Sequence, residues 1–461
     1  MASPAGAGPL RTGVFEPFDY AKGEGLALSR TARAGATFAK KQVNWYATAP
    51  GRPADPGNPA DPAYDWSDTD RFVGAARAQG VEPVLSIAGT PAWARAHGSC
   101  AAGPACAPSA YELGQFARAA ASRYSGGFAG LPGVHYWQAW SEPNLEYFLV
   151  PNAPATYRNM VRQFAAGVKA VNGNNRVIAG GLAPLARPGA TVGPLRFMRK
   201  LLCMKGRRRP RKACGQQVPL DIWSTHPYTT GGPTHSAPGR DDVSLGDLPQ
   251  MTRLLRAADR ARRIVNSSRR TPFWVTEFSW DTRPPDPGGV PLSRHARWVG
   301  EALYRMWKAG VSTVFWFQLR DEARRGRSFA ATYQSGLYFR GRTFRRDRPK
   351  PALRAFRFPF VALPAGRKRV TVWGRTPDSG RGRVVIQARY RGHGWRKVAS
   401  LRASRAGVFH RRLRRARPLR MRAKYRGRRS LPFAVHPTRD VYQPPFGGRR
   451  LPRPRVAPRA Y

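Results

Sequence analysis

The chain has 461 residues, 41% of them apolar, so it is long enough to bury a large core and to form more than one domain. No stretch approaches the roughly 18 consecutive apolar residues of a membrane span, and no transmembrane segment is predicted. Residues 1–6 lack a basic segment followed by an apolar one, so no signal peptide is visible. Either the chain is cytosolic or an export signal lies outside this sequence.

Eight short apolar or β-branched runs alternate with helical patterns, which indicates βαβ units and a parallel sheet. The predicted strands are 14–17, 37–45, 81–87, 134–142, 176–180, 220–228, 273–277 and 311–318. The predicted helices are 66–79, 109–124, 154–171, 194–202, 248–265, 293–309 and 350–356. Eight strands with interposed helices over about 345 residues predict an α/β fold, a (β/α)₈ TIM barrel, at residues 13–360 after an N-terminal extension at 1–12.

The pattern changes after the barrel. From residue 366 to 437, short runs alternate buried and basic residues with a period of two, as Met421, Ala423 and Tyr425 do between Arg422 and Lys424. We interpret this part as a small all-β, sandwich-like domain. Residues 438–461 are rich in proline and arginine and are predicted to be a disordered tail.

The four cysteines fall into two neighbouring pairs, Cys100 with Cys106 and Cys203 with Cys214. Two local disulfides would persist only in an oxidising compartment, so they favour a secreted or cell-surface protein. Zinc binding is the weaker interpretation, because CxxC spacing and nearby histidines are missing.

The net charge is +54, from 80 Lys and Arg against 26 Asp and Glu. Residues 366–461 hold 29 of the basic residues and only two acids, Asp378 and Asp440. This basic C-terminal region would suit an anionic cell-surface polymer or nucleic acid. The alternative, which we favour, is a compositional drift toward arginine along the whole chain.

Two glutamates carry the main functional signal. Glu142 closes the fourth predicted strand in Trp140-Ser141-Glu142-Pro143-Asn144, and Glu277 closes the seventh in Trp274-Val275-Thr276-Glu277. The carboxyl ends of barrel strands build the active site, and two carboxylates there can cleave a glycosidic bond. A lone strand-end glutamate is more often an ion-pair partner, but the two together favour catalysis.

These segments resemble the Trp-Asn-Glu-Pro-Asn and strand-seven segments of the clan A retaining glycoside hydrolases, particularly families 5 and 39. The resemblance covers about residues 13 to 358. It implies an O-glycosyl hydrolase acting on an oligo- or polysaccharide, with Glu142 as acid/base and Glu277 as nucleophile, and it implies neither a cofactor nor a metal. The expected substrate-binding residues are Ser141, Asn144, His226, Tyr228, Trp316, Trp280, Trp45 and Trp93. For Trp45, Trp93 and Trp280 we favour the alternative of a structural role, and His226 and Tyr228 could equally pack in the barrel.

One position departs from the family pattern. Ser141 stands where the family has the asparagine that contacts the sugar's 2-hydroxyl. The alternative function is therefore a catalytically impaired carbohydrate-binding barrel. We expect a monomer in either case.

Overall fold

The computed structural model describes residues 8–17, 20, 23–98, 100, 103–326, 329, 332–414 and 418–443. Its centre is a closed barrel in which neighbouring strands follow the order β1-β14-β11-β9-β5-β4-β3-β2, and every neighbouring pair is parallel. The barrel strands are β1 (Arg11–Phe15), β2 (Phe38–Asn44), β3 (Glu82–Ala88), β4 (Tyr136–Ala139), β5 (Arg176–Leu182), β9 (Ile222–Thr225), β11 (Phe273–Phe278) and β14 (Val311–Phe317). The TIM barrel predicted from the sequence is confirmed.

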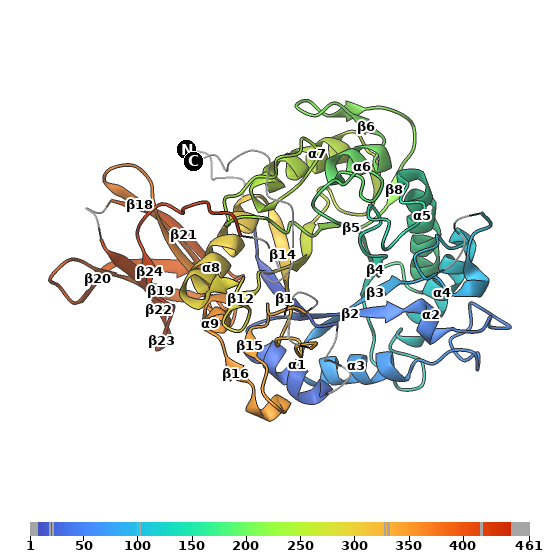
Figure 1. The fold of residues 1–461 in the computed structure, drawn as a ribbon, viewed down its shortest axis with the longest axis horizontal. Coiled ribbons are helices and arrows are strands. Elements are labelled where there is room, and N and C mark those ends of the chain that lie inside the picture. Colours follow the sequence, from blue (N-terminus) through green and yellow to red (C-terminus); the bar gives the residue numbers. More distant parts are fainter. Residues whose placement is uncertain are drawn as a thin grey trace.

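Helices surround the barrel on its outside (Figure 1). They are α1 (Glu24–Arg33), α2 (Trp45–Thr48), α3 (Ser67–Ala78), α4 (Ala110–Arg123), α5 (Pro154–Val171), α6 (Pro194–Leu201), α7 (Leu248–Arg260), α8 (Leu292–Lys308) and α9 (Pro351–Arg357), with 3₁₀ turns η2 (Ala92–Ala94), η3 (Leu245–Asp247) and η4 (Phe344–Arg346). Local signals fix several starts: Ser109 accepts the Glu112 N–H as the N-cap of α4, and a proline opens α5, α6 and α7. Helix α1 was not among the predicted helices.

The strands bury both faces, as parallel strands enclosed by helices do. Alternate residues point into the barrel, where a cluster of large side chains fills the interior: Phe15, Phe38, Val84, Ile178, Ile222, Trp274, Phe315 and Phe317. The remaining strand residues join the larger core between the strands and the helices. The barrel is therefore a packed body, and its chemistry must lie at the strand ends.

Several loops of the barrel contain pairs of short strands. They are β6 (Met204–Lys205) with β7 (Arg211–Lys212), β8 (Val218–Pro219) with β10 (Ile264–Val265), β12 (Thr282–Arg283) with β13 (Val290–Pro291), and β15 (Tyr338–Phe339) with β16 (Arg348–Pro349). Disulfides join Cys100 to Cys106 and Cys203 to Cys214, and the second closes the β6–β7 loop. Both predicted pairings are present.

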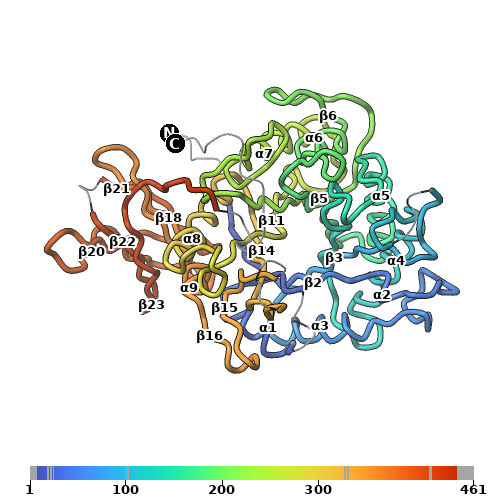
Figure 2. Tube along the Cα trace, viewed as in Figure 1, coloured from blue at the N-terminus to red at the C-terminus, as the bar shows by residue number. Residues whose placement is uncertain are grey.

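The C-terminal part is antiparallel and lies beside α8 and α9, as the tube in Figure 2 shows. One sheet has the order β17-β18-β21 and the other β20-β19-β22-β23, with β24 paired to β22. The strands are β17 (Phe360–Pro364), β18 (Arg369–Arg375), β19 (Gly382–Arg389), β20 (Trp395–Ala403), β21 (Val408–Arg414), β22 (Arg420–Tyr425), β23 (Arg428–Arg429) and β24 (Phe433–Ala434). The antiparallel part thus begins at β17, a few residues before the predicted position 366.

Aromatic rings and one buried arginine join this part to the barrel. The Trp373 ring lies 5.7 Å from the rings of Tyr304 and Trp307 in α8. The Arg375 guanidinium, which is fully buried, donates to Thr12 Oγ1 at 2.9 Å beneath β1. These contacts continue the barrel core into the C-terminal sheets.

The predicted C-terminal tail is partly ordered. Residues 438–443 run along the barrel, where Asp440 Oδ2 lies 2.9 Å from His235 Nδ1 and the Gln443 N–H donates to the Thr230 carbonyl at 2.7 Å. The prediction of disorder was therefore wrong for these six residues, because buried partners on the barrel compensate their polar groups. Residues 444–461, and residues 1–7 of the N-terminal extension, lie outside the described residues.

Candidate active site

Glu142 reaches the barrel mouth through a sharp turn after β4. Trp140 and Glu142 both have left-handed backbone angles, with φ of 67° and 45°. Such angles are costly for residues with a side chain and gather at functional sites. Here the surroundings hold them: Gln138 Nε2 donates to the Trp140 carbonyl at 2.8 Å, and the Glu142 N–H donates to the Gly181 carbonyl at 3.0 Å.

The end of β5 makes room for this turn. Gly180 and Gly181 have φ of 100° and 59°. A Cβ at Gly180 would lie 2.3 Å from the Ser224 carbonyl oxygen, and one at Gly181 would lie 3.1 Å from Gln138 Nε2. Only glycine fits both positions, which allows the Glu142 loop to approach β5 closely.

Glu277 is brought to the mouth by an irregularity in β11. The pairing of β11 with β14 shifts register between Val275 and Phe278. Trp274 points into the barrel and Phe278 packs in the outer core, so the strict alternation breaks between them. As a result the side chains of Thr276 and Glu277 both reach groups at the mouth, His226 and Tyr228 respectively.

His226 lies between the two carboxylates. Its Nδ1 is 2.9 Å from Glu142 Oε1 and 3.8 Å from Glu277 Oε2. These two carboxylate oxygens are therefore no farther apart than the sum of the two distances. The two carboxyl groups of a retaining glycosidase are about 5–5.5 Å apart, and those of an inverting one about 6.5–9.5 Å. The upper limit found here allows the retaining separation and reaches just the lower end of the inverting range. The structure thus brings together the two glutamates, 135 residues apart in the printed sequence.

Tyr228 and Lys40 complete the cluster. The Tyr228 hydroxyl donates to Glu277 Oε1 at 2.7 Å. Burial raises the Tyr228 pKa well above its usual value, and the Glu277 charge adds to this, so the tyrosine stays a donor. Lys40 Nζ lies 3.5 Å from the Thr276 carbonyl and 4.2 Å from the centre of the Phe15 ring. Burial lowers its pKa to about 8, against the opposing pull of both glutamates, so it is mostly charged at neutral pH.

Burial also sets the protonation of Glu142 and His226. It raises the pKa of Glu142 to about 7, although nearby Lys40 acts in the opposite direction. It lowers the pKa of His226 to about 4, so the imidazole is neutral at pH 7. A carboxyl group that is still half protonated near neutrality is suited to give and take a proton there.

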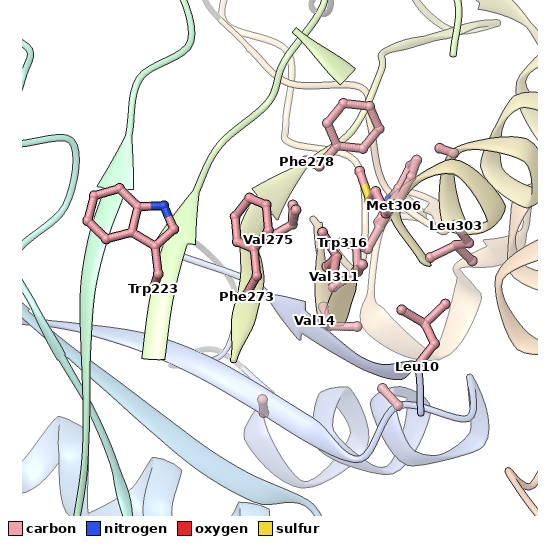
Figure 3. Close-up of a cluster of buried hydrophobic side chains, with 14 of the residues drawn as sticks. Leu10, Val14, Trp223, Phe273, Val275, Phe278, Leu303, Met306, Val311 and Trp316 are labelled. Atoms are coloured by element: carbon pink, nitrogen blue, oxygen red, sulfur yellow. The ribbon is translucent and has the colours of Figure 1, made fainter. Parts of the chain in front are cut away.

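Trp316 does not lie in this site. It is 1% exposed, its indole N–H donates to the Ser335 carbonyl, and it packs in the layer between β14 and α8 with Leu303 and Met306 (Figure 3). The predicted ring-stacking role is wrong, because alternation along β14 sends Trp316 outward and Phe317 inward.

Three other predicted contacts belong to the scaffold. Asn144 is fully buried, and within the described residues its side-chain amide bonds to backbone groups of Ala183 and Val192. Trp45 and Trp280 are also fully buried, Trp45 stacked on Phe116. These side chains have no surface for a sugar, so the predicted substrate contacts are wrong, and the structural role favoured for Trp45 and Trp280 fits their burial.

Trp93 and Ser141 remain candidate contacts. Trp93 is half-buried and donates its indole N–H to the Ala49 carbonyl at 2.9 Å, with its ring edge-on to Trp45. Ser141 is 5% exposed and precedes Glu142 in the turn.

Sequence reasoning missed Tyr333. This half-buried ring lies 5.0 Å from Phe317 and close enough to Tyr228 to raise its pKa. It comes from the loop after β14, where no motif marks it. Among the described residues no group of three or more His, Cys, Asp or Glu side chains is placed to hold a metal ion, and no helix is long and apolar enough to cross a membrane.

No protein-family model and no curated protein matches the sequence. Solved structures do. A monomeric β-xylosidase from Caulobacter crescentus CB15 superposes with a TM-score of 0.53 at 16% identity, covering 89% of this chain and 95% of that one. The GH39 enzyme from Xanthomonas axonopodis pv. citri gives 0.52 at 16% identity, with 94% of each chain covered. A GH39 β-xylosidase from Caulobacter crescentus gives 0.51 at 17% identity, with 84% and 83% covered. The chain thus shares the fold of these β-xylosidases and of the GH39 enzyme.

Proposed function

We propose that this protein is a retaining glycoside hydrolase that cleaves O-glycosidic bonds of an oligo- or polysaccharide. The proposal rests on one observation: at the barrel mouth, carboxylate oxygens of Glu142 and Glu277 lie 2.9 Å and 3.8 Å, respectively, from His226 Nδ1. The resulting upper limit on their separation allows the short distance at which one carboxylate can attack the sugar directly.

In the first step, Glu277 attacks the anomeric carbon and forms a glycosyl ester while the bond to the leaving oxygen breaks. Glu142 gives its proton to that oxygen. Tyr228 donates to Glu277 Oε1, which leaves Oε2 as the oxygen for attack. In the second step Glu142, now a carboxylate, takes a proton from water, and the resulting hydroxide displaces Glu277.

His226 and Lys40 support these two roles. The neutral imidazole forms one hydrogen bond with Glu142, which holds this carboxyl toward the leaving group without adding a charge. Lys40 places a buried positive charge near both glutamates and so limits the repulsion between them in the state where both are ionised.

The proposal is tested with aryl β-xylosides, β-glucosides and β-mannosides, since solved structures of this fold include β-xylosidases. Wild type, Glu277→Ala and the control Glu146→Ala are compared, because Glu146 is an exposed glutamate on the same loop as Glu142. We expect the wild type and the control to hydrolyse at least one substrate and Glu277→Ala none. Equal rates for all three on every substrate would reject the proposal.

A second candidate function is carbohydrate binding without turnover. The observation in its favour is Ser141, whose short side chain stands in the turn before Glu142. This function predicts glycan-array binding that Glu142→Gln leaves unchanged, with no product formed by the wild type.

The compartment and assembly state are further proposals. Both cysteine pairs form disulfides, which supports work outside the reducing cytosol, and one neighbour of this fold is described as monomeric. Thiol titration of the unreduced, denatured protein should find no free thiol, and light scattering should find a monomer.

A further inference from the structure

A groove on the outside of the barrel is lined by basic side chains from three segments. It measures about 1000 Å³ and lies between α7 and α8, next to the loop that precedes β11. The Thr252 hydroxyl of α7 donates to the Ala309 carbonyl after α8 at 2.7 Å, which fixes the two helices at this point. We call this feature the basic groove.

Two of its arginines are already neutralised. Arg256 Nη1 lies 2.8 Å from Asp259 Oδ2, and Arg305 Nη2 lies 2.7 Å from Glu301 Oε1. Asp259 is the one acid in the lining, and it also accepts the Thr271 hydroxyl at 2.6 Å. The Asp259 carboxylate is therefore already paired with Arg256 and Thr271, and it does not neutralise the other cations of the groove.

Five exposed cations remain, and they carry the inference: Arg253, Arg260, Arg269, Arg270 and Lys308. Within the described part of the chain, none of them forms an ion pair with a carboxylate. Elsewhere on the barrel, arginines at comparable positions have acid partners, such as Arg77 with Glu82 and Arg123 with Asp70. The groove thus gathers on one concave surface five cations without an acid partner in the part of the chain that the structure describes.

The lining also limits the kind of ligand. It contains no aromatic side chain on which a nucleobase or the apolar face of a neutral sugar could stack. Guanidinium groups instead suit anionic groups such as carboxylates and phosphates, which they bind in a planar, two-pronged geometry. Because the lining has no ring for a nucleobase, the carboxylates of a polysaccharide suit it better than nucleic acid. We propose that the basic groove binds an acidic polysaccharide through its repeated carboxylate groups.

The position of the groove separates this binding from catalysis. Helices α7 and α8 end at Arg260 and Lys308, and Arg269 and Arg270 precede β11, so the charges gather toward the N-terminal ends of the strands. Glu142 and Glu277 lie at the opposite, carboxyl ends. A polymer held in the groove leaves the mouth free, so the groove would tether the protein to an acidic glycan while another chain is bound at the mouth.

The test compares two full-length variants with matched charge changes. The groove variant carries Arg253→Gln, Arg260→Gln, Arg269→Gln, Arg270→Gln and Lys308→Gln. The control variant carries Arg391→Gln, Lys397→Gln, Arg402→Gln, Arg405→Gln and Arg411→Gln, which are exposed positions in the basic C-terminal region. Binding to immobilised polygalacturonate is measured at about 50 mM salt, where the screening length of about 14 Å still lets the charges act together.

We expect the groove variant to bind at least about tenfold more weakly and the control variant to stay within about twofold of wild type. A smaller variant with only Arg269→Gln and Arg270→Gln, both on an exposed loop, should lose part of the affinity, and it guards against a folding defect. Equal losses in groove and control variants would assign the binding to diffuse charge and overturn the proposal. Tighter binding of duplex DNA than of polygalacturonate at the same salt would overturn the choice of ligand.

Discussion

The barrel mouth and the basic groove use charge in opposite ways. At the mouth, the glutamate side chains are only 14% and 17% exposed, and each contacts another polar group of the cluster. In the groove, five cations are exposed and have no acid partner among the described residues. Burial shifts the pKa values of Glu142, His226 and Lys40 at the mouth, whereas the groove presents its cations to solvent. The mouth is therefore suited to proton transfer and the groove to salt-sensitive binding.

The largest expected effect separates Glu142 from a neighbouring glutamate. Glu142→Gln should lower kcat/KM by about 10²–10⁴-fold on substrates with poor leaving groups, because the amide cannot donate the proton. Glu146→Gln, on the exposed part of the same loop, should stay within about twofold of wild type. Similar losses for both variants in steady-state assays would contradict the assignment.

The same glutamate should set the alkaline side of the pH profile. Because burial raises the pKa of Glu142 to about 7, the acid is protonated below that pH and lost above it. We expect kcat/KM to fall with a midpoint near pH 7 in the wild type and the fall to vanish in Glu142→Gln. A fall that persists unchanged in the variant would mean that another group titrates.

A smaller effect should come from the tyrosine that holds Glu277. Tyr228→Phe removes one hydrogen bond to a carboxylate, worth about 1.5–3 kcal/mol, so kcat should drop about 10–100-fold. Tyr147→Phe is the matched control, since Tyr147 is 78% exposed. A change confined to KM would indicate that Tyr228 binds substrate and does not orient the nucleophile.

Trp316 should matter for stability and little for catalysis. Trp316→Ala should lower the free energy of unfolding by about 3–5 kcal/mol, because it empties a buried site between β14 and α8. For Trp316→Phe we expect kcat and KM within a few-fold of wild type. A large rise in KM with unchanged stability would restore a role in substrate binding.

The smallest effect tests whether mouth and groove are independent. The groove variant should hydrolyse a small soluble aryl glycoside within about twofold of the wild-type rate, since the groove cations lie toward the other ends of the strands. Loss of this activity in a variant whose circular dichroism is unchanged would show that the two regions are coupled.

Much of this could be predicted because apolar runs mark barrel strands and their ends mark the mouth. Glu142 and Glu277 were predicted in this way, whereas His226 and Tyr228 were expected from the resemblance to the glycoside hydrolases. It was harder to predict which side chains of a strand point into the barrel. In residues 311–317 almost every side chain is buried, so the sequence pattern does not distinguish the two faces. For this reason the prediction for Trp316 was wrong.

Other features depend on contacts between distant segments. Asn144 was expected to bind substrate. The folded loop shows instead that its amide donates hydrogen bonds to the carbonyls of Ala183 and Val192. The arginines of α7 are visible at helical spacing, but their proximity to Lys308 and to Arg269 follows from the packing of two helices. A single sequence contains no local signal for such meetings.

Trapping the covalent intermediate is the most direct test of the central claim. A 2-deoxy-2-fluoro glycoside with a good leaving group slows both steps, and slows the second enough for the glycosyl enzyme to accumulate, so peptide mass analysis can locate the modified residue. We predict a single adduct, on Glu277, and none in Glu277→Ala. An adduct on another residue would contradict the account. So would turnover without inactivation that gives a product of inverted anomeric configuration.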